Sequence, residues 1–231
     1  MSAIPFQKEI FYPESDGEPM AESDLHRKEM TYLIDSLGDY FLPVPNVYVA
    51  GNLFLYYAQG DPRAVVAPDT FVVKGVPKKD RKTYKLWEEG KVPCLIVEVT
   101  SDTTQDDDLD RKKSVYERLG VEDYILFDPL GDYLDPRLQG YRLLQGRYRP
   151  SRPERDGSLV SQAIGVTFRI EGTHLRLTET GSGKSLLRYQ ESMERMRRTE
   201  ALLAEETAAR RAAEEEIARL RAELERLRKT D

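Results

Sequence analysis

The sequence predicts a mixed α/β domain over residues 1–184, with a central β-sheet flanked by helices, followed by a helical tail over residues 185–231. In the body, short runs of β-branched and aromatic residues alternate with helical patterns, and a strand, helix, strand order is typical of an α/β sheet. The tail contains no Gly or Pro and consists mainly of Ala, Glu, Arg and Leu, which favours one long helix.

The composition of the 231-residue chain restricts its class further. No apolar run approaches the ~20 residues that a membrane helix requires, and the N-terminal stretch lacks the basic start and apolar segment of a secretion signal. A single cysteine, Cys94, excludes an intramolecular disulfide and suits a reducing compartment. We therefore expect a cytoplasmic protein without a membrane anchor.

Charge is distributed unevenly along the chain. The net charge of -6 is not typical of a protein that coats nucleic acid non-specifically. The tail from Leu186 onward carries 11 basic and 11 acidic residues, so the excess acid lies in the body. One basic cluster interrupts the body and consists of Lys78, Lys79, Arg81, Lys82 and Lys85. It is the predicted place of nucleic-acid contact, although such runs are more often solvated loops.

The first elements follow an irregular lead-in over residues 1–20. Ser23 has the features of a helix N-cap, and apolar residues at helical spacing predict a helix that Gly38 ends. Residues 44–49 and 53–57 are β-branched or aromatic and predict two strands.

The next elements form the predicted centre of the sheet. Residues 65–73 predict a strand interrupted by Pro68, which cannot donate to a sheet ladder. Residues 94–99 are almost continuously apolar, as expected of a central strand covered on both faces. A helix over 108–119 and a second buried strand over 124–128 complete a crossover.

The remainder of the chain predicts a β extension and a coiled coil. Short segments separated by Gly and Pro over residues 133–177 indicate a hairpin-rich β extension. The tail has apolar residues at coiled-coil spacing, namely Ile217, Leu220, Leu224 and Leu227. Glu206 and Arg210 fall on the same seam, which limits pairing to about two heptads. We expect a weak homodimer through this C-terminal helix.

Two acidic residues lie where predicted strands end. Asp69 follows Pro68, and Glu98 interrupts an apolar run. A carboxylate in a buried strand is costly unless it is paired, hydrogen-bonded or bound to a cation. Two carboxylates on neighbouring strands can bind a hard divalent ion such as Mg²⁺ and leave positions for water and phosphate oxygens. Lys112, on the following helix, is placed to reach back over the strand ends and stabilise developing charge.

The order of these motifs is similar to the core of the PD-(D/E)XK nucleases. Pro68-Asp69 comes first, then a strand that bears Glu98-Val99-Thr100, and then a helix. Thr100 departs from the pattern, because the superfamily has a lysine there. The resemblance implies a restriction-endonuclease-like core in which Asp69 and Glu98 bind Mg²⁺ or Mn²⁺, helped by the Val99 carbonyl.

Four segments together resemble the Uma-two family of putative restriction endonucleases within that superfamily. They are residues 66–73, 96–104, 108–116 and 122–129. In that family the lysine is often relocated to the following helix, and Lys112, four residues before Tyr116, occupies the matching position. The helix with His26 and the stretch 133–142 also match one branch, so the resemblance covers about residues 20–180.

Each candidate residue also has a structural interpretation. Asp69 can be a turn residue, Glu98 can form a salt bridge, and Lys112 can be a solvated helix residue. His26 is more often a capping or packing residue than a ligand. Glu29, one turn further along the same helix, is a second candidate of this kind.

The resemblance implies metal-dependent hydrolysis of DNA phosphodiester bonds. Two other functions stay open. The first is a nuclease-like domain without catalysis that acts as a binding or assembly module. Metal binding distinguishes it, because its inactive site should not become tighter when Mg²⁺ or Mn²⁺ is added. An interaction protein that works through the coiled coil would be inert as residues 1–184 alone.

Overall fold

The computed structural model describes residues 10–15, 23–101 and 107–228. It divides the chain into two compact units, Met1–Leu186 and Leu187–Asp231. The large sheet of the first unit has the strand order β1-β4-β6-β7-β8-β9. These strands are β1 Val47–Ala50, β4 Thr70–Lys74, β6 Leu95–Val99, β7 Asp123–Phe127, β8 Leu138–Leu144 and β9 Arg147–Pro150.

Two smaller sheets and four helical segments complete the described part of this unit. One sheet contains β10 Leu159–Ser161, β11 Val166–Glu171 and β12 His174–Glu179, and the other contains β3 Val65–Val66, β2 Leu55–Tyr56 and β5 Tyr84–Lys85. The helices are α1 Asp24–Tyr40, α2 Leu86–Glu89, the π-helical turn η1 Asp107–Lys112 and α3 Lys113–Leu119.

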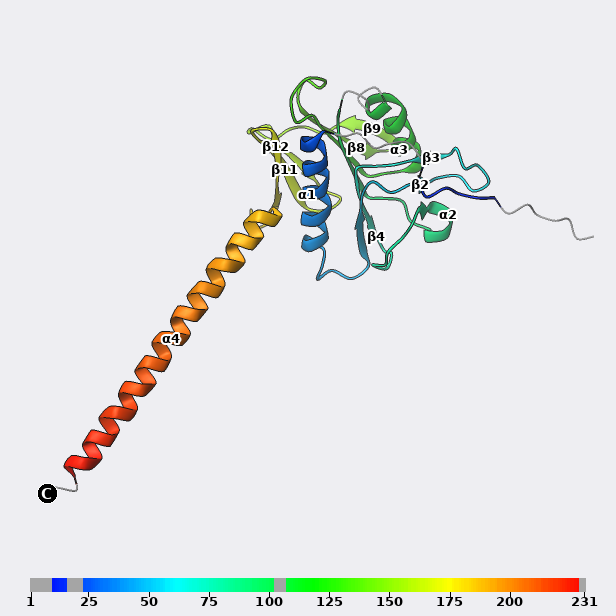
Figure 1. Cartoon of the computed structure of the whole chain (residues 1–231). Coiled ribbons are helices and arrows are strands. Elements are labelled where there is room, and N and C mark those ends of the chain that lie inside the picture. The colour runs from blue at the N-terminus through cyan, green and yellow to red at the C-terminus, as the bar shows by residue number, and fades with distance from the viewer. Residues whose placement is uncertain (1–9, 16–22, 102–106, 229–231) are drawn as a thin grey trace, which may run out of the picture. The chain divides into compact units, whose positions relative to one another are not determined.

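Strand β6 lies inside the large sheet. It pairs antiparallel with β4 and parallel with β7. The crossover between β6 and β7 carries η1 and α3, in agreement with the strand, helix, strand order of the sequence. Helix α3 is labelled in Figure 1. All five residues of β6 are buried, as its apolar run predicts. The predicted class, a central mixed sheet flanked by helices, is confirmed.

Helix α1 begins at the predicted cap but continues beyond the predicted end. Ser23 Oγ accepts a hydrogen bond from His26 N at 3.1 Å, which satisfies one free amide of the first turn. Gly38 lies inside the helix, which continues to Tyr40, so the prediction that Gly38 ends it is wrong. The chain stays packed through Phe41, which is buried, and this packing outweighs the low helix propensity of one glycine.

Pro68 separates two strands that belong to different sheets. The strand predicted over residues 65–73 is therefore divided into β3 and β4. A loop passes close to this break, where Asn52 N donates to Pro68 O at 2.8 Å. A Cβ atom at Gly51 would lie 1.9 Å from Asp69 O. Only glycine permits this close approach of the two chain segments. The contact holds Asp69, the residue before β4, in place.

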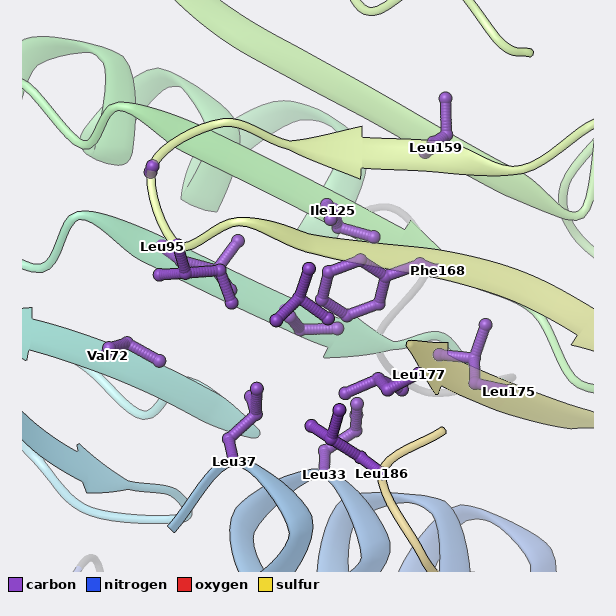
Figure 2. Packing of buried hydrophobic residues seen from close by; sticks show 14 of the residues in the cluster. Leu33, Leu37, Val72, Leu95, Ile125, Leu159, Phe168, Leu175, Leu177 and Leu186 are labelled. Carbon is purple, nitrogen blue, oxygen red and sulfur yellow. The ribbon is translucent and has the colours of Figure 1, made fainter. Parts of the chain in front are cut away.

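Hydrophobic clusters cover both faces of the large sheet. Successive residues of a strand point to opposite faces, so Leu95 and Ile96 of β6 belong to different clusters. Leu95 belongs to the same cluster as Leu37 of α1 and Phe168 of β11, and all three are labelled in Figure 2. Ile96 belongs to the cluster that contains Tyr116 of α3. Helices α1 and α3 therefore contribute to the cores on opposite faces.

In its described residues the second unit consists mainly of the helix α4 Tyr189–Leu227, which is 39 residues long. The side chains of Ile217, Leu220 and Leu224 are 50%, 50% and 56% exposed, and the side chain of Leu227 lies outside the described residues. The helical tail agrees with the sequence, whereas its coiled-coil pairing stays a prediction. Among the described residues, no helix has the length and apolar character needed to cross a membrane.

Candidate active site

Asp69 and Glu98 lie next to each other at one end of the large sheet. Asp69 directly precedes β4, where Thr70 pairs with Val97 of β6. Asp69 N donates to Glu98 Oε2 at 3.2 Å, and Val99 N donates to Asp69 Oδ2 at 2.7 Å. Glu98 is fully buried, and the Asp69 side chain is 14% exposed. Backbone amides thus fix the two carboxylates relative to each other.

Lys112 contacts Glu98 from the crossover. Its Nζ donates to Glu98 Oε2 at 3.1 Å, and the lysine side chain is only 10% exposed. Lys112 is the last residue of η1, and single π-helical turns occur frequently at functional sites. The ammonium offsets much of the cost of burying the carboxylate.

Tyr116 is a further partner of Glu98 that the sequence interpretation missed. Its phenol donates to Glu98 Oε1 at 2.7 Å, and the side chain is fully buried. Lys112 and Tyr116 are four residues apart, so they point to the same side of the helix. This spacing is visible in the sequence, but a tyrosine on an apolar helix face reads as a core residue.

His26 contacts Asp69 from the other face of the sheet. Its Nε2 lies 3.2 Å from Asp69 Oδ2, and the residue is 3% exposed. Because α1 and α3 contribute to the cores on opposite faces, side chains from both layers meet at this end of the sheet. The structure therefore brings together four of the predicted site residues, which are His26, Asp69, Glu98 and Lys112.

Glu29 connects α1 to β12. Its Oε1 lies 2.6 Å from His174 Nδ1, and its Oε2 accepts a hydrogen bond from Leu175 N at 2.8 Å. Glu29 is fully buried, and these contacts satisfy both of its oxygens. They indicate a structural role at the junction of two elements, whereas its approach to a metal stays a prediction.

Arg81 of the basic cluster forms a structural ion pair. Its Nε and Nη2 each donate to Glu89 at 2.8 Å, and its guanidinium lies 4.2 Å from the centre of the Tyr48 ring. The hydrogen bonds from Arg81 lower the pKa of Glu89, which keeps the pair ionised. The Arg81 side chain is 3% exposed, so its charge is directed into the protein.

The lysines of the basic cluster also have partners, but several of these contacts are exposed. Lys79 pairs with Glu89 at 3.5 Å, Lys82 with Glu14 at 2.9 Å, and Lys85 with Glu88 at 3.0 Å. Lys78 donates to the backbone carbonyls of Phe41 and Leu42. The side chains of Lys79 and Lys82 are 58% and 80% exposed. Exposed ion pairs are weak, so a phosphate can compete for these two lysines.

The donor set suits a magnesium-like cation. Within the described ranges, no group of three or more His, Cys, Asp and Glu side chains is arranged to hold a metal. Mg²⁺ is usually bound by one or two carboxylates, with water and substrate phosphates as the other ligands. In the described part of the chain, Asp69 Oδ1 has no hydrogen-bond donor, so this oxygen is available as a ligand.

Two buried threonines, Thr70 and Thr100, stand close to the carboxylates in the sequence. Oγ1 of Thr70, next to Asp69, and Oγ1 of Thr100, two residues after Glu98, have no hydrogen-bond partner among the described residues. Buried hydroxyls are generally satisfied by protein, water or an ion. Thr70 lies on the same face of the sheet as its partner Val97 and therefore opposite to Glu98, so only the Thr100 hydroxyl is on the Glu98 side of the strand.

A family model agrees with the resemblance found in the sequence. A family model described as Uma2, putative restriction endonuclease, matches residues 2–171. A crystal structure of a putative nuclease belonging to DUF820 from Anabaena variabilis ATCC 29413 matches at 16% identity with a TM-score of 0.47, over 63% of this chain and 76% of that chain. No curated protein matches the sequence. The family match includes Asp69, Glu98 and Lys112.

Proposed function

The chain belongs to the Uma2 family of putative restriction endonucleases, and from this premise we propose that it hydrolyses DNA phosphodiester bonds with Mg²⁺ or Mn²⁺. Family membership supports nuclease function. The observation that best supports the mechanism is the convergence of Asp69, Glu98 and Lys112 at one end of the sheet. Phosphodiester hydrolysis needs a cation site, an activated water and a donor for developing negative charge, and these three residue types can supply them.

Asp69 and Glu98 are the proposed cation ligands. A bound Mg²⁺ or Mn²⁺ would supply an activated water and would neutralise charge on the scissile phosphate. Asp69 offers the open Oδ1, while its Oδ2 is oriented by Val99 N and His26. We assign His26 the role of orienting Asp69, since residues that hold a ligand in place affect metal affinity and activity. The Val99 carbonyl is a proposed additional ligand.

Lys112 is the proposed donor to the reacting phosphate. In the structure its ammonium is hydrogen-bonded to Glu98 Oε2. Its long, flexible side chain can turn from Glu98 toward a phosphate oxygen or the attacking water, where negative charge develops in the transition state. This role replaces that of the superfamily lysine at the position of Thr100.

Cleavage assays on the full chain test the proposal. Plasmid DNA, linear duplex DNA and RNA are incubated with Mg²⁺, Mn²⁺ or a chelator. Asp69→Asn and Glu98→Gln keep the side-chain shape but remove the charge, so both should abolish cleavage. Asp132→Asn and Glu122→Gln, at exposed carboxylates, should cleave like the wild type. Cleavage that persists in chelator or in Glu98→Gln would rule out the mechanism, and a preference for RNA would correct the substrate.

A nuclease-like binding module without catalysis is the alternative function. The buried ion pair of Lys112 and Glu98 is compatible with it, because such a pair can be purely structural. Calorimetric titration with Mn²⁺ separates the two. The nuclease should bind the ion and lose the binding in Glu98→Gln, whereas a purely structural pair should show no binding in either protein.

We also propose that α4 pairs weakly with a second copy of itself. Ile217, Leu220 and Leu224 are about half exposed in the single chain and follow a coiled-coil spacing. A long helix in water is stabilised mainly by burial of its apolar face. These apolar residues form a stripe along α4, and the same stripe on a second chain is the simplest surface that can cover them.

A further inference from the structure

We infer that Tyr116 is a positioning residue of the nuclease site, which acts by fixing the orientation of the Glu98 carboxylate. This inference rests on the proposed function and adds a residue to it. The phenol of Tyr116 donates to Glu98 Oε1 at 2.7 Å, and both side chains are completely buried.

The two oxygens of Glu98 have different partners. Oε1 accepts the hydrogen bond from Tyr116. Oε2 accepts hydrogen bonds from Lys112 Nζ at 3.1 Å and from Asp69 N at 3.2 Å. Because a carboxylate is planar, the bond at Oε1 restricts its rotation, and Oε2 is the oxygen that stays directed toward Asp69.

Tyr116 is better suited to fix the carboxylate than Lys112 is. The Tyr116 ring is enclosed in the hydrophobic cluster of its face and makes an edge contact with the Tyr124 ring, with 5.1 Å between the ring centres. A buried tyrosine has only two side-chain torsions, both restricted here by packing. A lysine has a flexible four-carbon stem, so its ammonium can move while its backbone stays in place.

This difference matters when Lys112 turns to the substrate. The proposed mechanism requires its ammonium to leave Glu98 for a phosphate oxygen or the attacking water. If Lys112 alone held Glu98, the carboxylate would lose its orientation at that step. With Tyr116 bound to Oε1, Glu98 keeps its place while Oε2 becomes available to a cation.

A phenol also orients the carboxylate without neutralising it. A second ammonium or guanidinium at Oε1 would compensate the charge that attracts the divalent ion. The neutral donor of Tyr116 leaves the negative charge of Glu98 for the cation and for Lys112. The contacts of Glu98 therefore separate orientation, by Tyr116, from charge compensation, by Lys112.

Tyr116→Phe tests the inference, because it removes one oxygen atom and keeps the ring. The fold should persist, since Lys112 and Asp69 N still bind Glu98. Tyr148→Phe is the matched control: Tyr148 lies in the same cluster, and its buried hydroxyl has no hydrogen-bond partner among the described residues. Mn²⁺ affinity is measured by calorimetry on the full chain, together with kcat and KM for DNA cleavage and the melting temperature.

We expect Tyr116→Phe to weaken Mn²⁺ binding about 10- to 100-fold and to lower kcat with little change in KM, as is typical when a group that orients a metal ligand is removed. Tyr148→Phe should retain the wild-type values. Wild-type Mn²⁺ affinity and kcat in Tyr116→Phe, with only a lower melting temperature, would assign the phenol a structural role and overturn the inference alone. A wild-type protein that binds no Mn²⁺ would overturn the proposed function and this inference together.

Discussion

Lys112 Nζ lies 3.1 Å from Glu98 Oε2, although the two residues are 14 positions apart and the glutamate is completely buried. A buried ion pair of this kind is weak evidence for stability by itself, because desolvation of both charges opposes their attraction. Here the pair lies beside Asp69, whose Oδ1 has no donor within the described residues. The lysine thus compensates Glu98 at the place where we propose that a divalent cation binds.

Removal of the Lys112 ammonium should affect both stability and cleavage. Lys112→Met keeps most of the stem but leaves the Glu98 charge uncompensated, which typically costs ~3–5 kcal/mol for a buried pair. Cleavage should fall by about 10²- to 10³-fold, as for loss of one transition-state donor. Urea unfolding in chelator measures the first effect, and added Mn²⁺ should restore part of the stability. Lys28→Met, at an exposed position of α1, is the control. Unchanged cleavage in Lys112→Met would exclude Lys112 as the relocated lysine.

Glu29→Gln should destabilise the protein without changing the site. The substitution weakens the charged hydrogen bond to His174 but keeps an acceptor for Leu175 N. Loss of a charged hydrogen bond typically costs ~1.5–3 kcal/mol. Mn²⁺ affinity and cleavage per folded molecule should remain at wild-type values. A loss of Mn²⁺ binding as large as in Glu98→Gln would instead show that Glu29 is a ligand.

Arg81 and Lys82 should respond differently to replacement by alanine. Arg81→Ala breaks a nearly buried bidentate pair with Glu89 and should lower stability by ~2 kcal/mol. Lys82→Ala removes an exposed charge and should leave stability unchanged. If Lys82 contacts phosphate, its loss should weaken DNA binding. It should also reduce the slope of log affinity against log salt concentration by about 1. Fluorescence anisotropy at several salt concentrations measures this slope, and an unchanged slope would place the DNA elsewhere.

Asp128 should make stability depend on acid pH. Burial raises its pKa, but hydrogen bonds from the backbone N–H groups of Leu130, Gly131, Tyr133 and Leu134 outweigh burial and lower the pKa below its ordinary value. The ionised Asp128 carboxylate therefore stabilises the folded state. This stabilisation is fully present above the unfolded pKa of ~3.9 and is lost as the pH falls through the lower folded pKa.

The variant Asp128→Asn checks this sign. It should be less stable than the wild type at neutral pH, and the difference should shrink below about pH 4. Urea unfolding of both proteins across this range gives the difference directly. A difference that stays constant with pH would mean that the charge of Asp128 contributes nothing and that only the loop geometry matters.

Deletion of residues 190–231 should leave the body folded and shift any dimer to monomer. The body and α4 form separate compact units, so little packing within the body is lost. Light scattering at several protein concentrations measures the oligomeric state. In the full chain, Leu220→Glu should dissociate the dimer, whereas Ala218→Glu, outside the apolar stripe, should not. An oligomer that survives the deletion would place the interface in the body.

Local pattern was sufficient for the elements that carry the candidate site. The apolar run around Glu98 predicts a central strand because a strand covered on both faces excludes polar residues. The Ser23 cap predicts the start of α1 because a side-chain oxygen satisfies amides three residues away. Asp69 and Glu98 were identifiable since both stand at ends of apolar strands, and Lys112 was identifiable from its place on the following helix and from the resemblance. These features depend on neighbours in the sequence.

Tertiary structure decided which partner each of these side chains has. Helix α1 passes through Gly38 because packing up to Phe41 outweighs a local helix-ending signal. The ion pair of Lys82 with Glu14 spans 68 positions, and the contact of Glu29 with His174 spans 145. The phenol of Tyr116 is distinguished from an ordinary core tyrosine only by the carboxylate that the fold places against it. Such contacts join residues that are distant in the chain, and hydrophobic periodicity records which side of an element is buried but not what lies against it.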